Sequence, residues 1–390
     1  MREGWEYKKL GEVGTFQRGK GIQKTDFVER GMPCIHYGQL HTVFGVATEK
    51  HLSHISRELY SKSIIASKND VIFALTSEDV EGSCRSTAWL GDYDVAISSD
   101  AAVYKHSINP KFVAYYLRSD SFFIEKSKYA RGFKVTHIKT SDIEKIPIPL
   151  PSLEVQQKVV AELDQINDLI RLKKEQLKEY DNLAQSIFYD MFGDPVENEK
   201  GWEVKKLQDI STIVTGNTPS RKILEFYNND FIEWIKSDNI DDSALYPTKA
   251  KEFLSENGAN KGRIANLGEI LVTCIAGSIS SIGTSCVLNR SVAFNQQINA
   301  ITKLNDVDAF FLRSLIKYSK KYFQEYATTG MKHIISKSVF ESIKVPLPPL
   351  PLQQEFSSRI EQMEKLKAEV QKTITDLETL LASRMQYWFE

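Results

Sequence analysis

The chain has 390 residues, of which 42% are hydrophobic and 26% are charged. This length predicts two or three domains, and this composition excludes a disordered chain, a collagen-like chain and a small protein built on disulfides. The 50 basic and 51 acidic residues give a net charge of −1, which by itself argues against a strongly basic nucleic-acid binder.

The sequence has neither the pattern of a signal peptide nor that of a membrane span, because no stretch reaches the roughly 18 uncharged apolar residues that a span needs. The cysteines are too far apart for a C-x-x-C motif; they are Cys34, Cys84, Cys274 and Cys286. Cysteines spaced in this way indicate free thiols in a reducing compartment. We therefore expect a cytoplasmic protein.

The first 148 residues alternate short β-prone runs with turns rich in Gly, Asn and Asp. Residues 70–75 form one such run, whereas residues 110–119 have a helical pattern. This mixture predicts a strand-rich globular domain of mixed α/β (α+β) class, which we call the first head.

Residues 149–192 predict a long helix. Apolar residues recur there in steps of three and four. Pro151 excludes helix before Ser152, which is a predicted N-cap, and Gly193 can adopt the left-handed conformation that ends a helix. Roughly 40 residues at about 1.5 Å each give a rod of about 60 Å.

The second half of the chain repeats the first. Residues 4–10 (GWEYKKL) recur as residues 201–207 (GWEVKKL), an offset of 197. The same offset relates residues 149–157 to residues 346–354, both of which carry Pro-Leu-Pro followed by Gln-Gln. One offset at two distant places indicates a tandem duplication. Residues 201–345 therefore predict a second strand-rich domain, the second head, and residues 346–390 predict a second long helix.

Both long helices have the same heptad register, and neither can bury its apolar stripe alone. We expect them to pair, and a pseudo-twofold axis between the repeats would make the pair antiparallel. Lys173 and Lys367 occupy core positions of this seam, where a charged residue commonly fixes register. The predicted interface residues are Leu163, Ile166, Ile170 and Leu177 in the first helix and Ile360, Met363, Val370, Ile374 and Leu377 in the second.

The charge is divided unevenly among these parts. Residues 1–150 hold 21 basic and 18 acidic residues, and residues 201–345 hold 18 and 15, so each head has a net charge of +3. Residues 151–200 have a net charge of −5 and residues 346–390 one of −2. Mildly positive heads on negative helices fit heads that meet phosphates and helices that meet other proteins.

Two basic loops occur in each repeat and make candidate DNA contacts. Lys, His and hydroxyl groups on short loops hold phosphates and read base edges. Ordinary solvated surface turns are the alternative, and the recurrence of the loops in both repeats favours function. The first choice is Lys134, His137 and Lys139 in one repeat with Lys332, His333 and Lys337 in the other; the second choice is Arg18, Lys20, Arg221 and Lys222.

Catalytic templates mostly fail along the sequence. The sequence from Gly14 matches the first part of the phosphate-binding-loop motif. It departs from the motif at Gly21, where Ser or Thr is required. No Asn/Asp-Pro-Pro-aromatic tetrad, G-x-S-x-G or H-E-x-x-H occurs. We expect no catalytic residues in this chain.

Two short patterns could be drawn as metal ligands. They are Cys34-x-His36 and His51-x-x-His54. Such pairs are more often a core pair and a surface loop, so we expect no metal site.

The layout resembles the specificity subunit of type I restriction-modification systems over the whole chain. The motifs that carry the resemblance are Gly-Trp-Glu-x-Lys-Lys-Leu (201–207), Thr-Gly-Asn-Thr-Pro-Ser (215–220), Trp-Ile-Lys-Ser-Asp-Asn-Ile (234–240) and Pro-Leu-Pro-Pro-Leu (346–350) with Gln353-Gln354. In the first repeat Ile-His-Tyr-Gly-Gln-Leu (35–40) stands where the second has residues 235–240. One departure is Leu352 before the two glutamines, where family members more often have Glu.

The resemblance implies a non-catalytic, DNA-binding subunit. Each head would be a target-recognition domain for one half of an asymmetric bipartite target in double-stranded DNA, and the helices would set the spacer length. Two modification (methyltransferase) subunits would dock on the helices and bring S-adenosylmethionine. Restriction (translocase) subunits would add ATP- and Mg-dependent translocation and cleavage.

A coiled-coil scaffold, or an orphan specificity protein whose heads bind another ligand, is the alternative. It explains the helices and the neutral total charge, but neither the paired basic loops nor the divergence of the heads. An adjacent adenine methyltransferase gene would favour the specificity subunit.

Overall fold

The computed structural model describes residues 4–132 and 135–390. The chain forms two compact units: residues 1–172 with 373–390, and residues 173–372. Both units mix strands and helices, which confirms the predicted fold class. Within the described part of the chain, no helix combines the length and the apolarity that crossing a membrane requires.

The first head is built on a five-stranded sheet in the order β2-β11-β7-β9-β4 and a four-stranded sheet in the order β5-β3-β10-β6. Two-stranded pairs, β1-β13 and β12-β8, flank them. The strands are β1 (Glu6–Lys9), β2 (Gly14–Arg18), β3 (Met32–Ile35), β4 (Ala47–Thr48), β5 (Ser53–Ile55), β6 (Ile65–Ala66), β7 (Val71–Ala74), β8 (Thr76–Ser77), β9 (Ser86–Trp89), β10 (Val95–Ile97), β11 (Ala101–His106), β12 (Thr136–His137) and β13 (Pro147–Leu150). The helices are α1 (Leu10–Val13), α2 (Tyr37–Thr42), α3 (Arg57–Ser61), α4 (Pro110–Tyr116), α5 (Asp120–Ser127) and α6 (Thr140–Ile143), with the 3-10 turn η1 (Lys24–Asp26).

The second head repeats this order with two main differences: among its described residues no strand is equivalent to β4, and a 3-10 turn stands in place of α2. Its sheets run β15-β23-β19-β21 and β17-β16-β22-β18, with the pairs β14-β25 and β20-β24. The strands are β14 (Glu203–Lys206), β15 (Thr212–Thr215), β16 (Ile232–Ile235), β17 (Phe253–Leu254), β18 (Ile264–Ala265), β19 (Ile270–Thr273), β20 (Ile275–Ala276), β21 (Ser285–Val287), β22 (Val292–Phe294), β23 (Ile298–Thr302), β24 (His333–Ile334) and β25 (Lys344–Leu347). The helices are α8 (Leu207–Ile210), α9 (Glu256–Ala259), α10 (Ala309–Tyr318), α11 (Lys320–Glu325) and α12 (Lys337–Ser342), with the 3-10 turns η2 (Leu224–Tyr227), η3 (Ser237–Asn239) and η4 (Ile279–Ser281).

Strand β7 shows how each head builds its core. Successive side chains of a strand point to opposite faces of the sheet, so Phe73 packs in the cluster that holds Phe112 of α4, whereas Ile72 packs with Ile35 and Trp89 between the two sheets. Helices, the larger sheet and the smaller sheet therefore form three layers.

The two repeated sequence segments pair with each other in the fold. Strand β1 lies antiparallel to β13 with Glu6 opposite Leu150, and β14 lies antiparallel to β25 with Glu203 opposite Leu347. The start and the end of each head thus form one ladder. This pairing gives a physical reason why those two segments are alike in both repeats while the residues between them differ.

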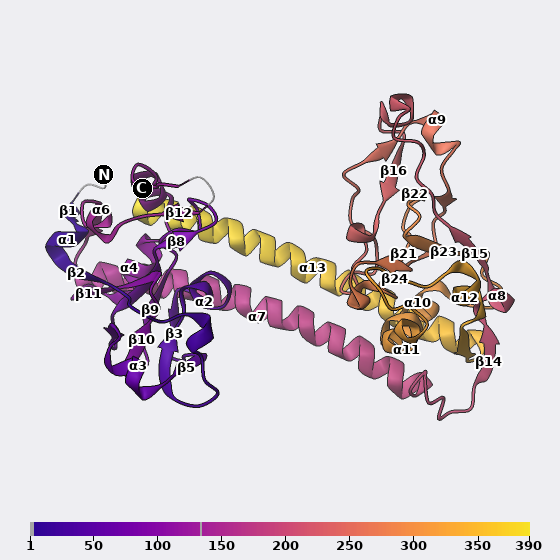
Figure 1. The fold of residues 1–390 in the computed structure, drawn as a ribbon, viewed down its shortest axis with the longest axis horizontal. Coiled ribbons are helices and arrows are strands. Elements are labelled where there is room, and N and C mark those ends of the chain that lie inside the picture. Colours follow the sequence, from indigo (N-terminus) through magenta and orange to yellow (C-terminus); the bar gives the residue numbers. More distant parts are fainter. Residues whose placement is uncertain (1–3, 133–134) are drawn as a thin grey trace. The chain divides into compact units, whose positions relative to one another are not determined.

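The two long helices are α7 (Leu153–Phe192) and α13 (Leu350–Phe389), each of 40 residues (Figure 1). In the first unit Glu162, near the start of α7, contacts Arg384, near the end of α13. In the second unit Asp181, later in α7, contacts Lys367, which precedes Arg384 in α13 and lies near the middle of that helix, at 2.9 Å. The helices are therefore antiparallel, as expected.

The ends of α7 follow the predicted signals. The Ser152 carbonyl accepts the Gln156 N–H at 3.0 Å, and the Ser152 hydroxyl accepts the Val155 N–H at 3.4 Å. Gly193 has a φ of 75° and donates its N–H to the Tyr189 carbonyl at 2.8 Å. This left-handed turn closes the helix.

The predicted interface residues are mostly buried, although not all of them serve only the helix pair. Leu163 belongs to the core cluster of the first head, and Ile360 and Met363 belong to that of the second. Buried positions are Leu163, Ile166, Ile170, Ile360, Met363, Val370 and Ile374, whereas Leu177 and Leu377 are half-buried.

Both lysines at seam positions form polar contacts. The ammonium group of Lys367 contacts the Asp181 carboxylate and, at 3.0 Å, the Glu364 carboxylate. These two carboxylates raise the pKa of Lys367 against the opposing effect of burial. Lys173 donates to the Gln176 side chain at 3.0 Å.

Candidate nucleic-acid interface

The loops that carry the candidate residues meet at one edge of the first head, which we call the loop edge. Strands β2, β3, β7 and β10 end there and β11 begins there. The Gly19 N–H donates to the Ala101 carbonyl at 2.9 Å, and the Leu75 N–H donates to the Asp100 carbonyl at 2.8 Å. The Ile138 N–H then donates to the Leu75 carbonyl at 3.2 Å. The structure therefore brings together the 18–20 and 137–139 loops, which the sequence separates by more than a hundred residues.

The second head has the same edge, built by equivalent bonds. The Gly216 N–H donates to the Ile298 carbonyl at 3.0 Å, and the Cys274 N–H donates to the Gln297 carbonyl at 2.8 Å. The Ile335 N–H donates to the Cys274 carbonyl at 2.9 Å. The duplication thus preserves the frame of the edge.

A glycine is required where each edge begins. A Cβ atom on Gly19 would lie 2.0 Å from the Ser98 carbonyl oxygen, and one on Gly216 would lie 2.1 Å from that of Asn295. No side chain fits at such distances. Gly19 and Gly216 therefore hold the first loop of each head against the strand ends, and their role is structural.

In each head, backbone hydrogen bonds hold the two sides of the loop that carries the first-choice residues together as a hairpin at the loop edge. In the first head β12 pairs with β8, and Arg131 and His137 exchange backbone hydrogen bonds of 3.1 and 2.8 Å. In the second head β24 pairs with β20, and the Thr328 N–H donates to the Ile334 carbonyl at 3.0 Å. The hairpins place the loops beside the strand ends.

A cavity opens beside the hairpin in both heads. That of the first head measures about 730 Å³ and lies among α2, β8, the 78–85 loop and Val135. That of the second head measures about 290 Å³ and lies among η3, β20, η4 and Gln297. The equivalent elements line both cavities.

The two cavities differ in chemistry. Both cavities are lined by hydroxyl groups, those of Tyr37, Thr42, Thr76 and Ser77 in the first and of Ser237, Thr273, Ser281 and Thr284 in the second. The first adds His41, Glu78, Asp79, Glu81 and Arg85, whereas the second adds Asp238 and Gln297. Two surfaces with one frame and unlike donors and acceptors suit two unlike base sequences.

Gln297 was not among the sequence-based candidates. Its Oε1 accepts from the Asn295 side-chain amide at 2.9 Å, and the Asn295 Oδ1 accepts the Gln297 N–H at 3.1 Å. Asn295 is buried and fixes the plane of the Gln297 amide. The Ser237 hydroxyl also donates to the Gln297 Oε1, at 3.4 Å, so the side-chain NH2 group of Gln297 is the part suited to donate to an acceptor on a base edge. The signal in the sequence is the polar run Asn-Gln-Gln (295–297) at the end of an apolar strand.

The described first-choice residues lie on the hairpins or directly after them. His137, Lys139 and Lys332 are exposed. His333 is half-buried, with its Nδ1 3.2 Å from the Thr328 carbonyl oxygen. Lys337 lies 3.5 Å from Glu341 at the start of α12. The remaining first-choice residue, Lys134, falls outside the described residues.

The second-choice residues differ in how far neighbouring groups hold them. Lys20 and Lys222 are exposed. The Arg18 guanidinium donates to the Ser99 carbonyl at 3.1 Å and contacts Asp100 at 3.4 Å.

Arg221 has the most contacts with neighbouring side chains among the nine candidates that the structure describes. Its guanidinium lies 4.8 Å from the ring centres of both Tyr227 and Trp234 and contacts the Glu252 carboxylate at 2.5 Å. These contacts of Arg221 therefore stabilise its own loop.

The residues of the two histidine patterns contact groups of the protein itself. Burial raises the pKa of the Cys34 thiol to about 12 and lowers that of His36, whose Nδ1 accepts the Gly38 N–H at 3.1 Å as the N-cap of α2. The Nε2 atoms of His51 and His54 lie 3.0 Å apart. Across residues 4–132 and 135–390, no three His, Cys, Asp or Glu side chains gather as a metal site.

Comparison with known proteins agrees with this architecture. The sequence model of the family described as "Type I restriction modification DNA specificity domain" matches residues 2–180 and 199–379, once in each repeat. The MjaVIII type I restriction enzyme specificity subunit of Methanocaldococcus jannaschii is 23% identical over 388 residues, which cover 93% of this chain and 87% of that protein. The StySPI specificity subunit of Salmonella potsdam is 20% identical over 411 residues, which cover 99% and 88%.

Solved structures share the fold. A chain from a study of the assembly and conformational transition of the type I R-M system has a TM-score of 0.61 at 19% identity, over 100% of this chain and 98% of that one. The type I restriction-modification S subunit from M. genitalium has a TM-score of 0.58 at 14% identity, over 99% and 96%. With one copy of the family's domain matched in each repeat, the chain belongs to the type I restriction-modification DNA specificity family and is a DNA-recognition subunit.

Proposed function

We propose that each head reads one half of an asymmetric bipartite target in double-stranded DNA through its loop edge. The observation that carries this proposal is that the two edges have the same hydrogen-bonded frame and different polar linings. In this proposal the hairpin lysines and histidines contact the backbone and the base edges, and Gln297 reads a base.

The chemistry would reside in partner subunits. Two modification subunits would bring S-adenosylmethionine, and restriction subunits would bring ATP and Mg. The chain itself would contribute binding and geometry and no catalytic group, which agrees with the failure of the catalytic templates along its sequence.

Exposed leucines at repeated positions mark a docking face for the modification subunits. Leu169 and Leu366 are 47% and 44% exposed, Leu183 and Leu380 are 48% and 45% exposed, and each pair is related by the repeat offset. A surface that occurs twice fits two copies of one partner. Substituting Asp at Leu169 and Leu366 should weaken assembly with the modification subunit, whereas Asp at Leu52, an equally exposed leucine of the first head, should not.

The test of recognition is methylome sequencing of cells that carry the chain with its methyltransferase. Wild type should give one bipartite motif. Gln297→Ala should relax or abolish one base position within a single half-site and leave the other half-site and the spacer unchanged. A change in both half-sites, or in neither, would contradict the assignment of one half-site to each head.

A further inference from the structure

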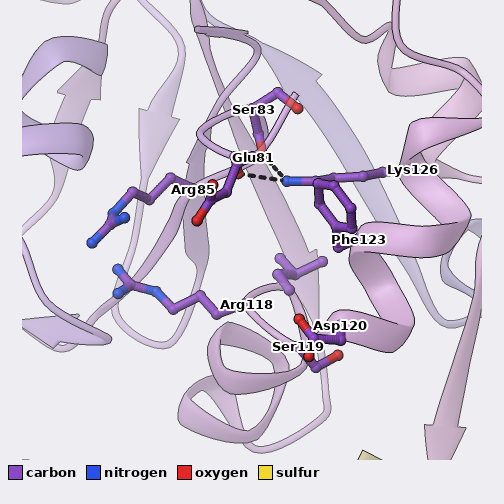
Figure 2. A pocket seen from close by; sticks show the side chains of 9 residues that line it. Glu81, Ser83, Arg85, Arg118, Ser119, Asp120, Phe123 and Lys126 are labelled. Atoms are coloured by element: carbon purple, nitrogen blue, oxygen red, sulfur yellow. Dashed lines mark hydrogen bonds between the residues drawn. The ribbon is translucent and has the colours of Figure 1, made fainter. Parts of the chain in front are cut away.

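A second cavity of the first head holds three cationic side chains. It measures about 300 Å³ and lies between the 81–85 loop and the junction of α4 with α5 (Figure 2). Arg85, Arg118 and Lys126 line it. It adjoins the loop edge, because Glu81 and Arg85 line both this cavity and the one beside the hairpin.

Carbonyl oxygens, which carry no net charge, hold two of the three cations. Lys126 is 3% exposed, and its ammonium group donates to the carbonyls of Glu81, at 2.9 Å, and Ser83. The Arg118 guanidinium donates to the Ser86 carbonyl at 3.1 Å and to the Gly45 carbonyl at 2.7 Å. These bonds satisfy the donors without an ion pair. Burial lowers the pKa of Lys126, and the nearby carboxylates of Glu81 and Asp79 oppose that shift without outweighing it.

Arg85 adds a further charge beside Arg118. Figure 2 shows the two guanidinium groups facing each other, and burial together with the charge of Arg85 lowers the pKa of Arg118 to about 10. Glu81 and Asp120 also line the cavity, but within the described residues no carboxylate forms an ion pair with any of the three cations. Two like charges at one cavity favour an anion between them.

At the equivalent place in the second head, a carboxylate of the chain itself pairs with a cationic side chain. Arg313 donates to the Ser285 carbonyl at 3.2 Å, just as Arg118 does to that of Ser86. There, however, the Asp242 carboxylate contacts the Lys320 ammonium at 2.5 Å. Thr284 precedes Ser285, whereas Arg85 precedes Ser86. The first head therefore has an extra arginine where the second has a hydroxyl, and among the described residues its carboxylates, Glu81 and Asp120, form no ion pair with the three cations.

We propose that the Arg85–Arg118 cavity binds a phosphate group, and that in the DNA-bound protein this is a backbone phosphate beside the half-site read by the first head. The second part rests on the proposed function. Planar guanidinium groups suit phosphate oxygens because they donate two parallel hydrogen bonds. Arg85 is exposed, so a phosphate of the DNA backbone can reach its guanidinium group from the solvent side.

The test uses the chain assembled with its modification subunits and a duplex that carries its target. Arg85→Ala should bind about tenfold more weakly, and the slope of log affinity against log salt should fall by about 0.9, as expected when one phosphate is no longer neutralised. Arg30→Ala is the matched control, because Arg30 is exposed and precedes the start of β3, whereas the loop edge lies at the end of that strand. Arg85→Lys should recover part of the affinity.

A neutral methylphosphonate, placed at each backbone position in turn, locates the phosphate. One position beside the half-site of the first head should weaken wild type as much as Arg85→Ala does and add nothing to Arg85→Ala. Inorganic phosphate tests the other source: if it stabilises wild type but not Arg85→Ala while DNA binding is unchanged, the cavity binds free phosphate and the backbone contact is refuted. Wild-type affinity and slope in Arg85→Ala, without phosphate-dependent stabilisation, overturn the inference entirely.

The measurement of duplex binding also separates this inference from the proposed function. Wild type that fails to distinguish its target from a scrambled duplex would contradict the proposed function. Wild type that distinguishes them while Arg85→Ala behaves identically would contradict only the phosphate site.

Discussion

The side-chain oxygen of Gln353 accepts the backbone N–H of Asp308 at 2.9 Å and so joins α13 to the loop before α10. The Gln353 Nε2 also donates to the Pro348 carbonyl at 2.7 Å. Gln156 forms the same two bonds in the first unit, to Asn109 and Pro151, each at 3.0 Å. The first glutamine of each Gln-Gln pair therefore fastens a head to its helix.

This relationship predicts a difference between neighbouring glutamines. Gln353 is fully buried, so Gln353→Ala leaves the Asp308 N–H and the Pro348 carbonyl without partners and should lower the free energy of unfolding by about 2 to 3 kcal/mol. Gln354→Ala is the control, because that side chain is exposed, and it should change the free energy by less than about 0.5 kcal/mol. Urea denaturation measures both; equal losses would refute the fastening role.

A pH dependence is expected from the helix pair of the first unit. Arg384 and Trp388 donate to the Glu162 carboxylate, and the Arg384 hydrogen bond lowers the pKa of that carboxyl below its ordinary 4.5. The stabilisation is present above pH 4.5 and is lost as the pH falls through the lowered pKa. Thermal unfolding between pH 3 and 7 should show a smaller acid loss in Glu162→Gln than in wild type. The control, Glu355→Gln, removes the exposed pair with Arg359 and should leave the wild-type profile intact.

The hairpin lysines of the second head should contribute to DNA affinity. Alanine at Lys332 and Lys337 removes two positive charges from the loop edge, so affinity for the target duplex should fall and the salt slope should decrease by about 1 for each phosphate that these lysines neutralise. Lys303→Ala is the control, because Lys303 follows the far end of β23 and is exposed. Filter binding or fluorescence anisotropy over a salt series measures the slope; an unchanged slope in the double variant would remove these lysines from the interface.

The helix pair should determine the spacer. Deleting residues 174–180 together with 371–377 removes one heptad from matching positions of α7 and α13, retains the exposed leucines of the docking face, and preserves the register of the apolar seam. Seven residues shorten a helix by about 10 Å, which corresponds to about three base pairs. Methylome sequencing should show both half-sites unchanged and a shorter gap. Altered half-sites with the original gap would contradict this role.

Much of the fold could be predicted because its signals are local. Apolar residues in steps of three and four, with a proline and a glycine at the ends, indicate the long helices directly, and α7 begins and ends close to the predicted residues. The loop edge was not predictable in the same way. Gln297 and Arg85 carry no motif, and their positions depend on hydrogen bonds between strand ends that lie far apart in the chain.

The sequence by itself determined that the chain is a duplicated unit of one strand-rich head and one long helix, because residue identity at a fixed offset needs no folding to be read. Only the tertiary structure decided which residues meet at each loop edge. Backbone bonds such as Ile138 to Leu75 and Ile335 to Cys274 gather distant loops there. The side chains that fill the two equivalent frames then differ, because the frame depends on the backbone and its few required glycines, whereas the lining does not.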